Sequence, residues 1–160
     1  DAGMTDLRLG GWIPALDELR RENATPILGI CLGMQMLCES SSEGQFKGLG
    51  WFSGHLERLA SERTANLKVP NMGWRDVNVI KKNELVSDAE NNSYYFVHSY
   101  ALRGIDDPSQ ILMTSEHGGE FIAGLQNGKS IGVQFHPEKS HNHGQKFING
   151  FVEMVCSASA

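Results

Sequence analysis

Three side chains have the types and sequence contexts of a nucleophile, a general base and a carboxylate that orients the base: Cys31, His136 and Glu138. Cys31 lies between an apolar run, residues 27–30, and a stretch of helix-forming residues, with a glycine two positions away on either side. This pattern is typical of a nucleophile elbow, in which a strand turns sharply into a helix and exposes the central side chain. The sequence therefore predicts a catalytic thiol.

The predicted elbow places the Cys31 thiol at the first turn of a helix. Backbone N–H groups and the positive end of the helix dipole are expected to lower the thiol pKa and to hold an oxyanion there. Gly29 and Gly33 are expected to be needed because a Cβ at either position would meet the neighbouring strand or helix. The alternative is a purely structural turn with Cys31 as a small buried hydrophobe.

His136 follows a predicted strand, residues 131–135, and precedes Pro137, which ends that strand. A histidine where a strand runs out onto a loop is placed to project into a site. Glu138, two residues on, can reach back to its ring and fix the tautomer. A surface histidine beside a glutamate is common, so this pair indicates a catalytic site only in combination with the predicted elbow at Cys31. The three side chains then form the nucleophile, base and orienter of a hydrolase triad, close in space and distant in sequence.

Four segments of the chain, taken together, resemble the class I glutamine amidotransferases that use a catalytic triad. The segments are GICLGMQ (29–35), VPNMGW (69–74), FVHSY (96–100) and GVQFHPEK (132–139). Within that family they are most similar to the glutaminase subunit of imidazole glycerol phosphate synthase, an enzyme of histidine biosynthesis. The resemblance covers nearly the whole chain. It implies an α/β, flavodoxin-like fold with a central, mostly parallel sheet, flanking helices and an antiparallel extension.

The resemblance also implies that L-glutamine binds beside Cys31. In this family the N–H of Leu32 would hold the oxyanion, Glu43 would meet the α-ammonium group, and residues 98–100 would form a wall whose backbone amides meet the α-carboxylate. Without the resemblance, Glu43 is an exposed loop acid and His98 a satisfied core histidine. The implied substrate-binding residues are Leu32, Gly33, Gln35, Glu43, His98, Ser99 and Tyr100.

The same resemblance implies a surface that contacts a partner subunit. Met72 and Trp74 flank a glycine in a segment with loop-like composition, and exposed methionine and tryptophan often mark partner surfaces. A tryptophan packed under a loop is the alternative. Lys139 matches a lysine that pairs with the synthase subunit. Asn71 and Arg75 replace a histidine and an asparagine that are common in the family, at what the resemblance implies is the partner-facing edge.

The expected reaction is hydrolysis of glutamine to glutamate and ammonia through a cysteine thioester. Ammonia would pass to a synthase (cyclase) subunit in a heterodimer that makes imidazole glycerol phosphate and AICAR, and no cofactor is expected. Three alternatives remain open. One is a paralogous subunit that supplies ammonia for amination of a surface sugar. Another is a cysteine peptidase or amidase, which Gln35 and the wall at 96–100 disfavour. The third is a non-catalytic docking module.

Composition limits the remaining classes of function. The chain has 160 residues, enough for one domain over 1–160, and its formal net charge of −5 offers no basic field for nucleic acid. Since no apolar run has membrane-spanning length, we expect no membrane segment. Three cysteines without metal or disulfide spacing fit a reducing cytoplasm, and no metal site is expected, His141 and His143 included.

The chain begins at Asp1 without an initiator methionine. Family members start with sheet strands and a loop that supplies one oxyanion donor, so we expect this chain to lack an N-terminal piece. An amphipathic helix is predicted at 12–21 and a closing helix at 144–156. Asn127-Gly128-Lys129 predicts a hairpin. Further strands are predicted at 56–59, 77–80, 94–97, 111–113 and 121–125.

Overall fold

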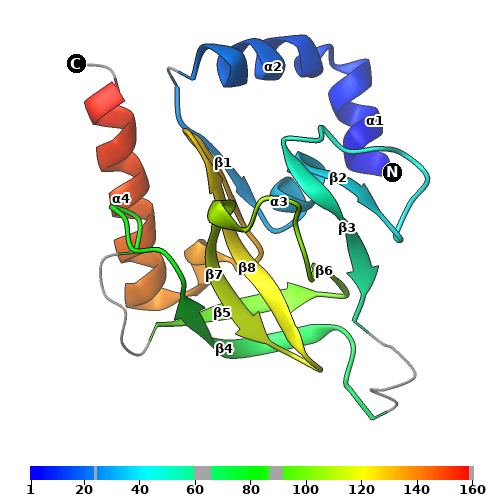
Figure 1. Cartoon of the computed structure of the whole chain (residues 1–160), viewed down its shortest axis with the longest axis vertical. Coiled ribbons are helices and arrows are strands. Elements are labelled where there is room, and N and C mark those ends of the chain that lie inside the picture. The colour runs from blue at the N-terminus through cyan, green and yellow to red at the C-terminus, as the bar shows by residue number, and fades with distance from the viewer. Residues whose placement is uncertain (24, 60–65, 87–91, 159–160) are drawn as a thin grey trace.

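The computed structural model describes residues 1–23, 25–59, 66–86 and 92–158, which form helices and two β-sheets (Figure 1). The helices are α1 (Ala2–Leu9), α2 (Trp12–Glu22), α3 (Leu32–Leu37) and α4 (His141–Ala158), with short 3₁₀ turns η2 (Pro108–Gln110) and η3 (Pro137–Lys139). The strands are β1 (Ile27–Ile30), β2 (Cys38–Ser41), β3 (Phe52–Arg58), β4 (Asn71–Val79), β5 (Ser93–His98), β6 (Tyr100–Leu102), β7 (Ile111–Glu116), β8 (Glu120–Asn127) and β9 (Ser130–Val133).

The larger sheet has six strands in the order β1-β9-β8-β7-β4-β5, and the smaller one has the order β2-β3-β6. In the larger sheet β1 pairs with β9 in parallel, and every other described pairing is antiparallel. The prediction of a mostly parallel sheet is therefore wrong for the described residues. Short connections such as that between β8 and β9 can join only antiparallel neighbours, whereas a parallel pair needs a long crossover. A flavodoxin-like strand order stays a prediction.

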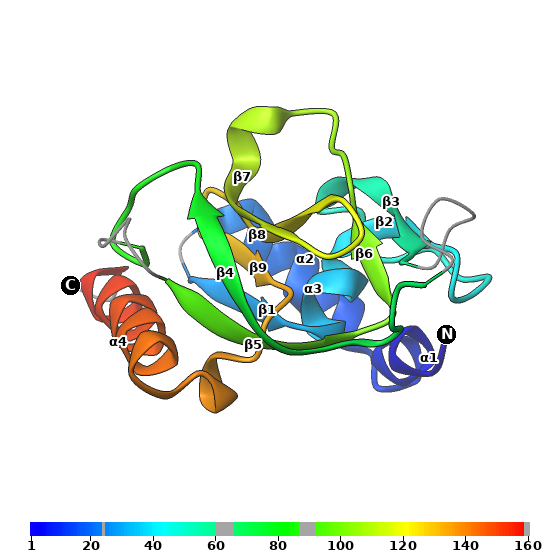
Figure 2. The same ribbon diagram turned by 90° about the horizontal axis from the view of Figure 1, so that it is seen from below.

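The larger sheet is curled rather than flat. Figure 1 shows β4 and β5 running across the ends of β7 and β8, and Figure 2 shows the same curl from below. In both views α4 lies on one side of the molecule and α1 on the other. The fold is thus α/β, with a mixed sheet between helices, and the parallel pair β1–β9 lies close to α3.

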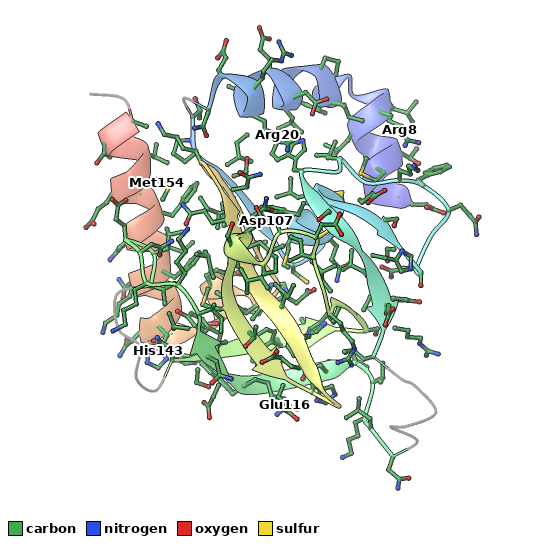
Figure 3. The ribbon with its side chains drawn as sticks, in the orientation of Figure 1. Arg8, Arg20, Asp107, Glu116, His143 and Met154 are labelled. Carbon is green, nitrogen blue, oxygen red and sulfur yellow. The ribbon has the colours of Figure 1, made fainter. Side chains whose placement is uncertain are left out.

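Two apolar clusters hold these layers together. One gathers four fully buried phenylalanines, including Phe135 and Phe147, whose rings meet edge to face with centroids 5.5 Å apart. Met154 of α4 packs against this cluster (Figure 3). The other cluster centres on Met34 and Phe52 and holds α3 against the smaller sheet. Arg20, labelled in Figure 3, donates from Nη2 to the Trp51 carbonyl at 3.3 Å and so ties α2 to the second cluster.

Most of the predicted elements are present. The helix at 12–21 is α2, the closing helix is α4, and the hairpin at Gly128 joins β8 to β9 with Asn127 opposite Ser130. The segment 69–74 differs from the prediction: β4 begins at Asn71, so the segment is largely strand rather than loop. Helix α1 was not predicted. None of the described helices is long and apolar enough to cross a membrane.

Candidate active site

Cys31 forms the turn between β1 and α3, as the elbow pattern predicts. Its backbone has φ 49° and ψ −102°, a conformation that non-glycine residues rarely adopt. The N–H of Cys31 donates to the Val133 carbonyl of β9 at 2.8 Å, and its own carbonyl accepts from the Gln35 N–H at 3.1 Å. Backbone strain of this kind costs on the order of 1–3 kcal/mol and is found at functional sites.

The two glycines of the elbow behave differently. A Cβ at Gly29 would lie 2.8 Å from the carbonyl carbon of Gly33 and 2.8 Å from the amide nitrogen of Met34. Backbone atoms cannot move aside, so the predicted steric need is confirmed at Gly29. A Cβ at Gly33 would meet nothing within 4 Å, so the same prediction is wrong for Gly33, which faces open space.

The thiol of Cys31 is half-buried and contacts a backbone carbonyl and a side-chain amide. Sγ lies 3.7 Å from the Val97 carbonyl, to which the thiol can donate, and accepts from Nε2 of Gln134 at 3.6 Å. Burial raises the pKa of Cys31, the Leu32 N–H opposes this, and the Glu138 carboxylate adds to the rise. The predicted lowering of the thiol pKa is therefore wrong: α3 is only six residues long, and its N–H group does not offset the loss of water.

His136 is placed as a general base. Its Nδ1 lies 2.6 Å from Oε1 of Glu138, which as a carboxylate can only accept, so the ring hydrogen belongs on Nδ1. Nε2 therefore carries a lone pair. That nitrogen is buried and has no hydrogen-bond partner among the described residues. A buried, unpartnered ring nitrogen beside a carboxylate is suited to accept a proton.

The strand pairing explains how base and nucleophile come together. Ile30 of β1 is opposite Val133 of β9 in the parallel pair, so Cys31 and His136 both follow the carboxyl ends of neighbouring strands. The Glu138 charge raises and the Lys139 charge lowers the pKa of the Cys31 thiol, in agreement with this placement. In the described part of the chain the thiol and the His136 ring form no hydrogen bond, so proton transfer requires the thiol to turn away from Val97.

A cavity of about 320 Å³ opens beside Cys31. Its walls include all the predicted substrate-binding residues except Gly33, and Pro70 and Val97 in addition. The volume is at the lower end for small-molecule sites, which suits an amino acid. The structure thus brings together Leu32, Gln35, Glu43, His98, Ser99 and Tyr100 from three separate segments of the chain; their contact with glutamine stays a prediction.

The His98 side chain is a satisfied core histidine, the alternative stated above. Nδ1 lies 2.8 Å from the Tyr100 carbonyl and Nε2 lies 3.0 Å from Nδ2 of Asn71. Burial lowers the pKa of His98 to about 4, although the hydrogen bond to Tyr100 opposes this, so the ring is neutral at pH 7. Because its side chain is occupied, His98 can offer a ligand chiefly its backbone.

The residues of β4 alternate between the interior and the surface. Met72 and Trp74 are exposed, as the partner prediction requires. The Trp74 ring packs at a tilt against His141, with ring centroids 5.2 Å apart, and His141 comes two residues after the exposed Lys139. Asn71, in contrast, is fully buried. The prediction that Asn71 and Arg75 belong to the partner-facing edge is wrong for Asn71, which points inward.

Gln134 is a residue of the site that the sequence reasoning missed. It is fully buried, and its side chain contacts both Gln35 and the Cys31 sulfur. It precedes His136 by two residues and directly follows β9, whose end lies beside the end of β1 and therefore close to Cys31. That position was a signal that could have identified it. Within the described ranges no cluster of three or more His, Cys, Asp or Glu is arranged for a metal.

Comparison with known proteins decides the family. The model of the family described as glutamine amidotransferase class-I matches residues 3–154. The chain belongs to the class I glutamine amidotransferases. The resemblance drawn from the four motifs is confirmed, and the site with Cys31, His136 and Glu138 is the candidate active site of this amidotransferase.

Curated relatives of the amidotransferase are subunits named HisH. Imidazole glycerol phosphate synthase subunit HisH 2 of Methanococcus maripaludis is 42% identical over 156 residues, which cover 97% of this chain and 76% of the relative. HisH 2 of Pseudomonas aeruginosa is 40% identical and HisH of Leptospira borgpetersenii 36% identical, each again covered to 76% of its length. The amidotransferase chain thus corresponds to about three quarters of these proteins.

Solved structures agree on the fold. The crystal structure of a glutamine amidotransferase matches 96% of this chain and 71% of its own chain with a TM-score of 0.65 and 18% sequence identity. A glutamine amidotransferase of Thermotoga maritima matches 94% of this chain and 56% of its own, with a TM-score of 0.53 and 22% identity. At these identities the likeness concerns the fold alone.

Replacing Glu138 with glutamine is expected to lower the kcat of glutamine hydrolysis about 10- to 100-fold. The amide keeps a hydrogen bond to Nδ1 of His136 but removes the charge that stabilises the imidazolium. We place the loss below that of buried triad acids because the Glu138 side chain is 53% exposed. Glutamate release measures the effect, and Glu153→Gln on the outside of α4 is the matched control. Equal rates for the two variants would remove Glu138 from the mechanism.

Proposed function

We propose that the amidotransferase is the glutaminase subunit of an imidazole glycerol phosphate synthase. It hydrolyses L-glutamine to glutamate and ammonia and delivers ammonia to a cyclase subunit that forms imidazole glycerol phosphate and AICAR. The observation that carries the proposal is the Cys31 turn at the end of β1, beside the strand β9 that leads to the His136–Glu138 dyad, in a chain whose relatives at 36–42% identity are named as HisH subunits of that synthase.

Acylation begins when the Cys31 thiol gives its proton to Nε2 of His136. The thiolate attacks the carboxamide carbon of glutamine, and the resulting oxyanion accepts hydrogen bonds from backbone N–H groups, among them that of Leu32. The imidazolium, stabilised by Glu138, returns its proton to the leaving nitrogen. The C–N bond breaks, ammonia departs and a thioester remains on Cys31.

Deacylation uses the same base. Nε2 of His136 takes a proton from water while the water oxygen attacks the thioester carbon, and the proton then goes to the departing sulfur of Cys31. Glutamate leaves and the thiol is restored. The thiol pKa, raised by burial, fits this cycle because a protonated resting nucleophile depends on the His136 base for activation.

The cyclase subunit is proposed to contact the exposed pair Met72 and Trp74 together with Lys139. Met72 is 58% and Trp74 43% exposed, an unusual degree for such large apolar side chains on a strand. Trp74 packs against His141, two residues after the end of η3, which carries the predicted orienting carboxylate Glu138. A partner seated there lies close to the base and can influence its geometry.

The test is ammonia and glutamate release from glutamine, with and without an imidazole glycerol phosphate synthase cyclase subunit and its ligand. We expect stimulation of at least about tenfold by the partner, since ammonia is useful only when a synthase accepts it. Met72→Ala should weaken the stimulation, whereas Ile80→Ala, an equally exposed apolar residue beyond the end of β4, should not.

Other results of this assay would favour one of the alternative functions. Glutamine turnover without stimulation would keep the glutaminase and transfer it to a paralogous synthase, such as one that aminates a surface sugar. Arg75, next to the exposed Trp74 on β4, departs from the residue common in the family, which keeps this alternative open. No turnover under any condition would leave the docking module.

A further inference from the structure

Gln134 is hydrogen-bonded on both sides of its side-chain amide. Its Nε2 lies 3.6 Å from the Cys31 sulfur, a normal contact length for an N–H donor and the large sulfur atom, and its Oε1 accepts from Nε2 of Gln35 at 3.1 Å. Gln134 is fully buried, so water cannot replace either contact. Its amide therefore has two possible orientations, and only one of them presents a donor to Cys31.

The Tyr100 carbonyl decides between these orientations. A backbone carbonyl can only accept, and Nε2 of Gln35 lies 3.3 Å from it. The side-chain amide of Gln35 must therefore present its NH₂ group to Tyr100 and, with the second hydrogen, to Gln134. Gln134 must then present its oxygen to Gln35, which leaves its own NH₂ group for the Cys31 sulfur.

The Tyr100 carbonyl also accepts a hydrogen bond from His98, which ends a second series of hydrogen bonds. Arg75 has no acceptor, so its Nε–H donates to Oδ1 of Asn71 at 3.1 Å. Asn71 then donates from Nδ2 to Nε2 of His98 at 3.0 Å, and His98 donates from Nδ1 to the Tyr100 carbonyl at 2.8 Å. Arg75 can only donate and the Tyr100 carbonyl can only accept, so the Asn71 amide and the His98 ring each have one orientation that satisfies the series.

We propose that Gln134 is a catalytic residue that donates a hydrogen bond to the Cys31 sulfur and stabilises the thiolate, and that Gln35 and the His98-held carbonyl of Tyr100 fix its orientation. The role in glutamine hydrolysis rests on the proposed function above. An N–H donor binds a thiolate more strongly than a neutral thiol, so the contact favours ionisation of a nucleophile that burial otherwise keeps protonated. Gln134 indeed acts to lower the Cys31 pKa against the effect of burial.

The test measures thiol ionisation directly and needs no glutamine. Iodoacetamide reacts with the thiolate, and peptide mapping by mass spectrometry gives the alkylation rate of each cysteine as a function of pH. For Gln134→Met, which fills similar space without a donor, we expect Cys31 alkylation at pH 7 to fall about 5- to 10-fold and its pH midpoint to rise. Cys156 is exposed and serves as the internal reference in the same molecule.

Two controls make the result specific. Gln126→Met makes the same exchange on β8, away from the sulfur, and should leave the Cys31 profile unchanged. Gln35→Leu keeps Gln134 but removes the group that orients it, so the Cys31 midpoint should again rise, by a smaller amount. This second variant also provides the answer if Gln134→Met does not fold.

The shape of the profile separates ionisation from access. A change of access alters the limiting rate at high pH, whereas loss of the Gln134 donor shifts the midpoint. An unchanged or lower Cys31 midpoint in Gln134→Met would overturn the proposal, and so would the same result in Gln35→Leu if Gln134→Met does not fold. Failure of the proposed function would look different: glutamine would remain unhydrolysed in the parent protein, while the alkylation profile would still depend on Gln134.

Discussion

Replacing Cys31 with alanine is expected to lower glutamine hydrolysis by at least about 10³-fold, because the thioester cannot form without the sulfur. The backbone at Cys31 has positive φ, but alanine has the same Cβ, so the turn gains no new steric conflict. Loss of activity should therefore occur without loss of fold. Glutamate release by the purified protein and its urea unfolding curve measure the two quantities separately.

The other cysteines provide the comparison for that experiment. Cys156 is exposed near the end of α4, and Cys156→Ala should retain the parent rate. Cys38 is fully buried, and burial raises its pKa to about 12, so it cannot supply a thiolate near pH 7. A glutamine-like electrophile should accordingly label Cys31 alone. Labelling of Cys38 first, or an active Cys31→Ala protein, would show that the elbow is not the catalytic turn.

Acidification from pH 6.5 to pH 4 is expected to lower the free energy of unfolding by about 3 kcal/mol through His98 alone, at about 1.4 kcal/mol per unit of pKa shift. The pKa of His98 is lowered from 6.5 to about 4 in the folded protein, mainly by burial. The unfolded chain therefore binds a proton at pH values where the folded protein does not. The contribution of His98 to the free energy of unfolding is present above pH 6.5 and is lost as the pH falls toward 4.

The matched pair His98→Gln and His55→Gln tests this assignment. Glutamine at position 98 can still accept from Asn71 and donate to the Tyr100 carbonyl, yet it does not titrate in this range. The unfolding free energy of His98→Gln, measured with urea at pH 6.5 and pH 4, should depend less on acid than that of the parent protein. His55 is exposed, so His55→Gln should keep the parental dependence. Identical slopes in both variants would contradict the burial argument.

Local sequence determined the parts of this protein that depend on neighbours in the chain. The glycine at position 29, the turn at Cys31 and the hairpin at Gly128 follow from backbone sterics, which a few consecutive residues specify. The His136–Glu138 pair is also local, since only Pro137 lies between base and orienter. For the same reason α2 and α4 were predictable from their apolar periodicity.

Tertiary structure alone decided three features: the sign of the Cys31 pKa shift, the mostly antiparallel pairing of the larger sheet and the inward position of Asn71. Burial of the thiol depends on residues about 65 and 100 positions away, Val97 and Gln134, and its cost exceeds the benefit of the short helix. The segment with Asn71 has a loop-like composition, but pairing with β5 makes it a strand and thereby alternates its side chains. Desolvation and strand pairing are set by distant partners, and no local pattern encodes them.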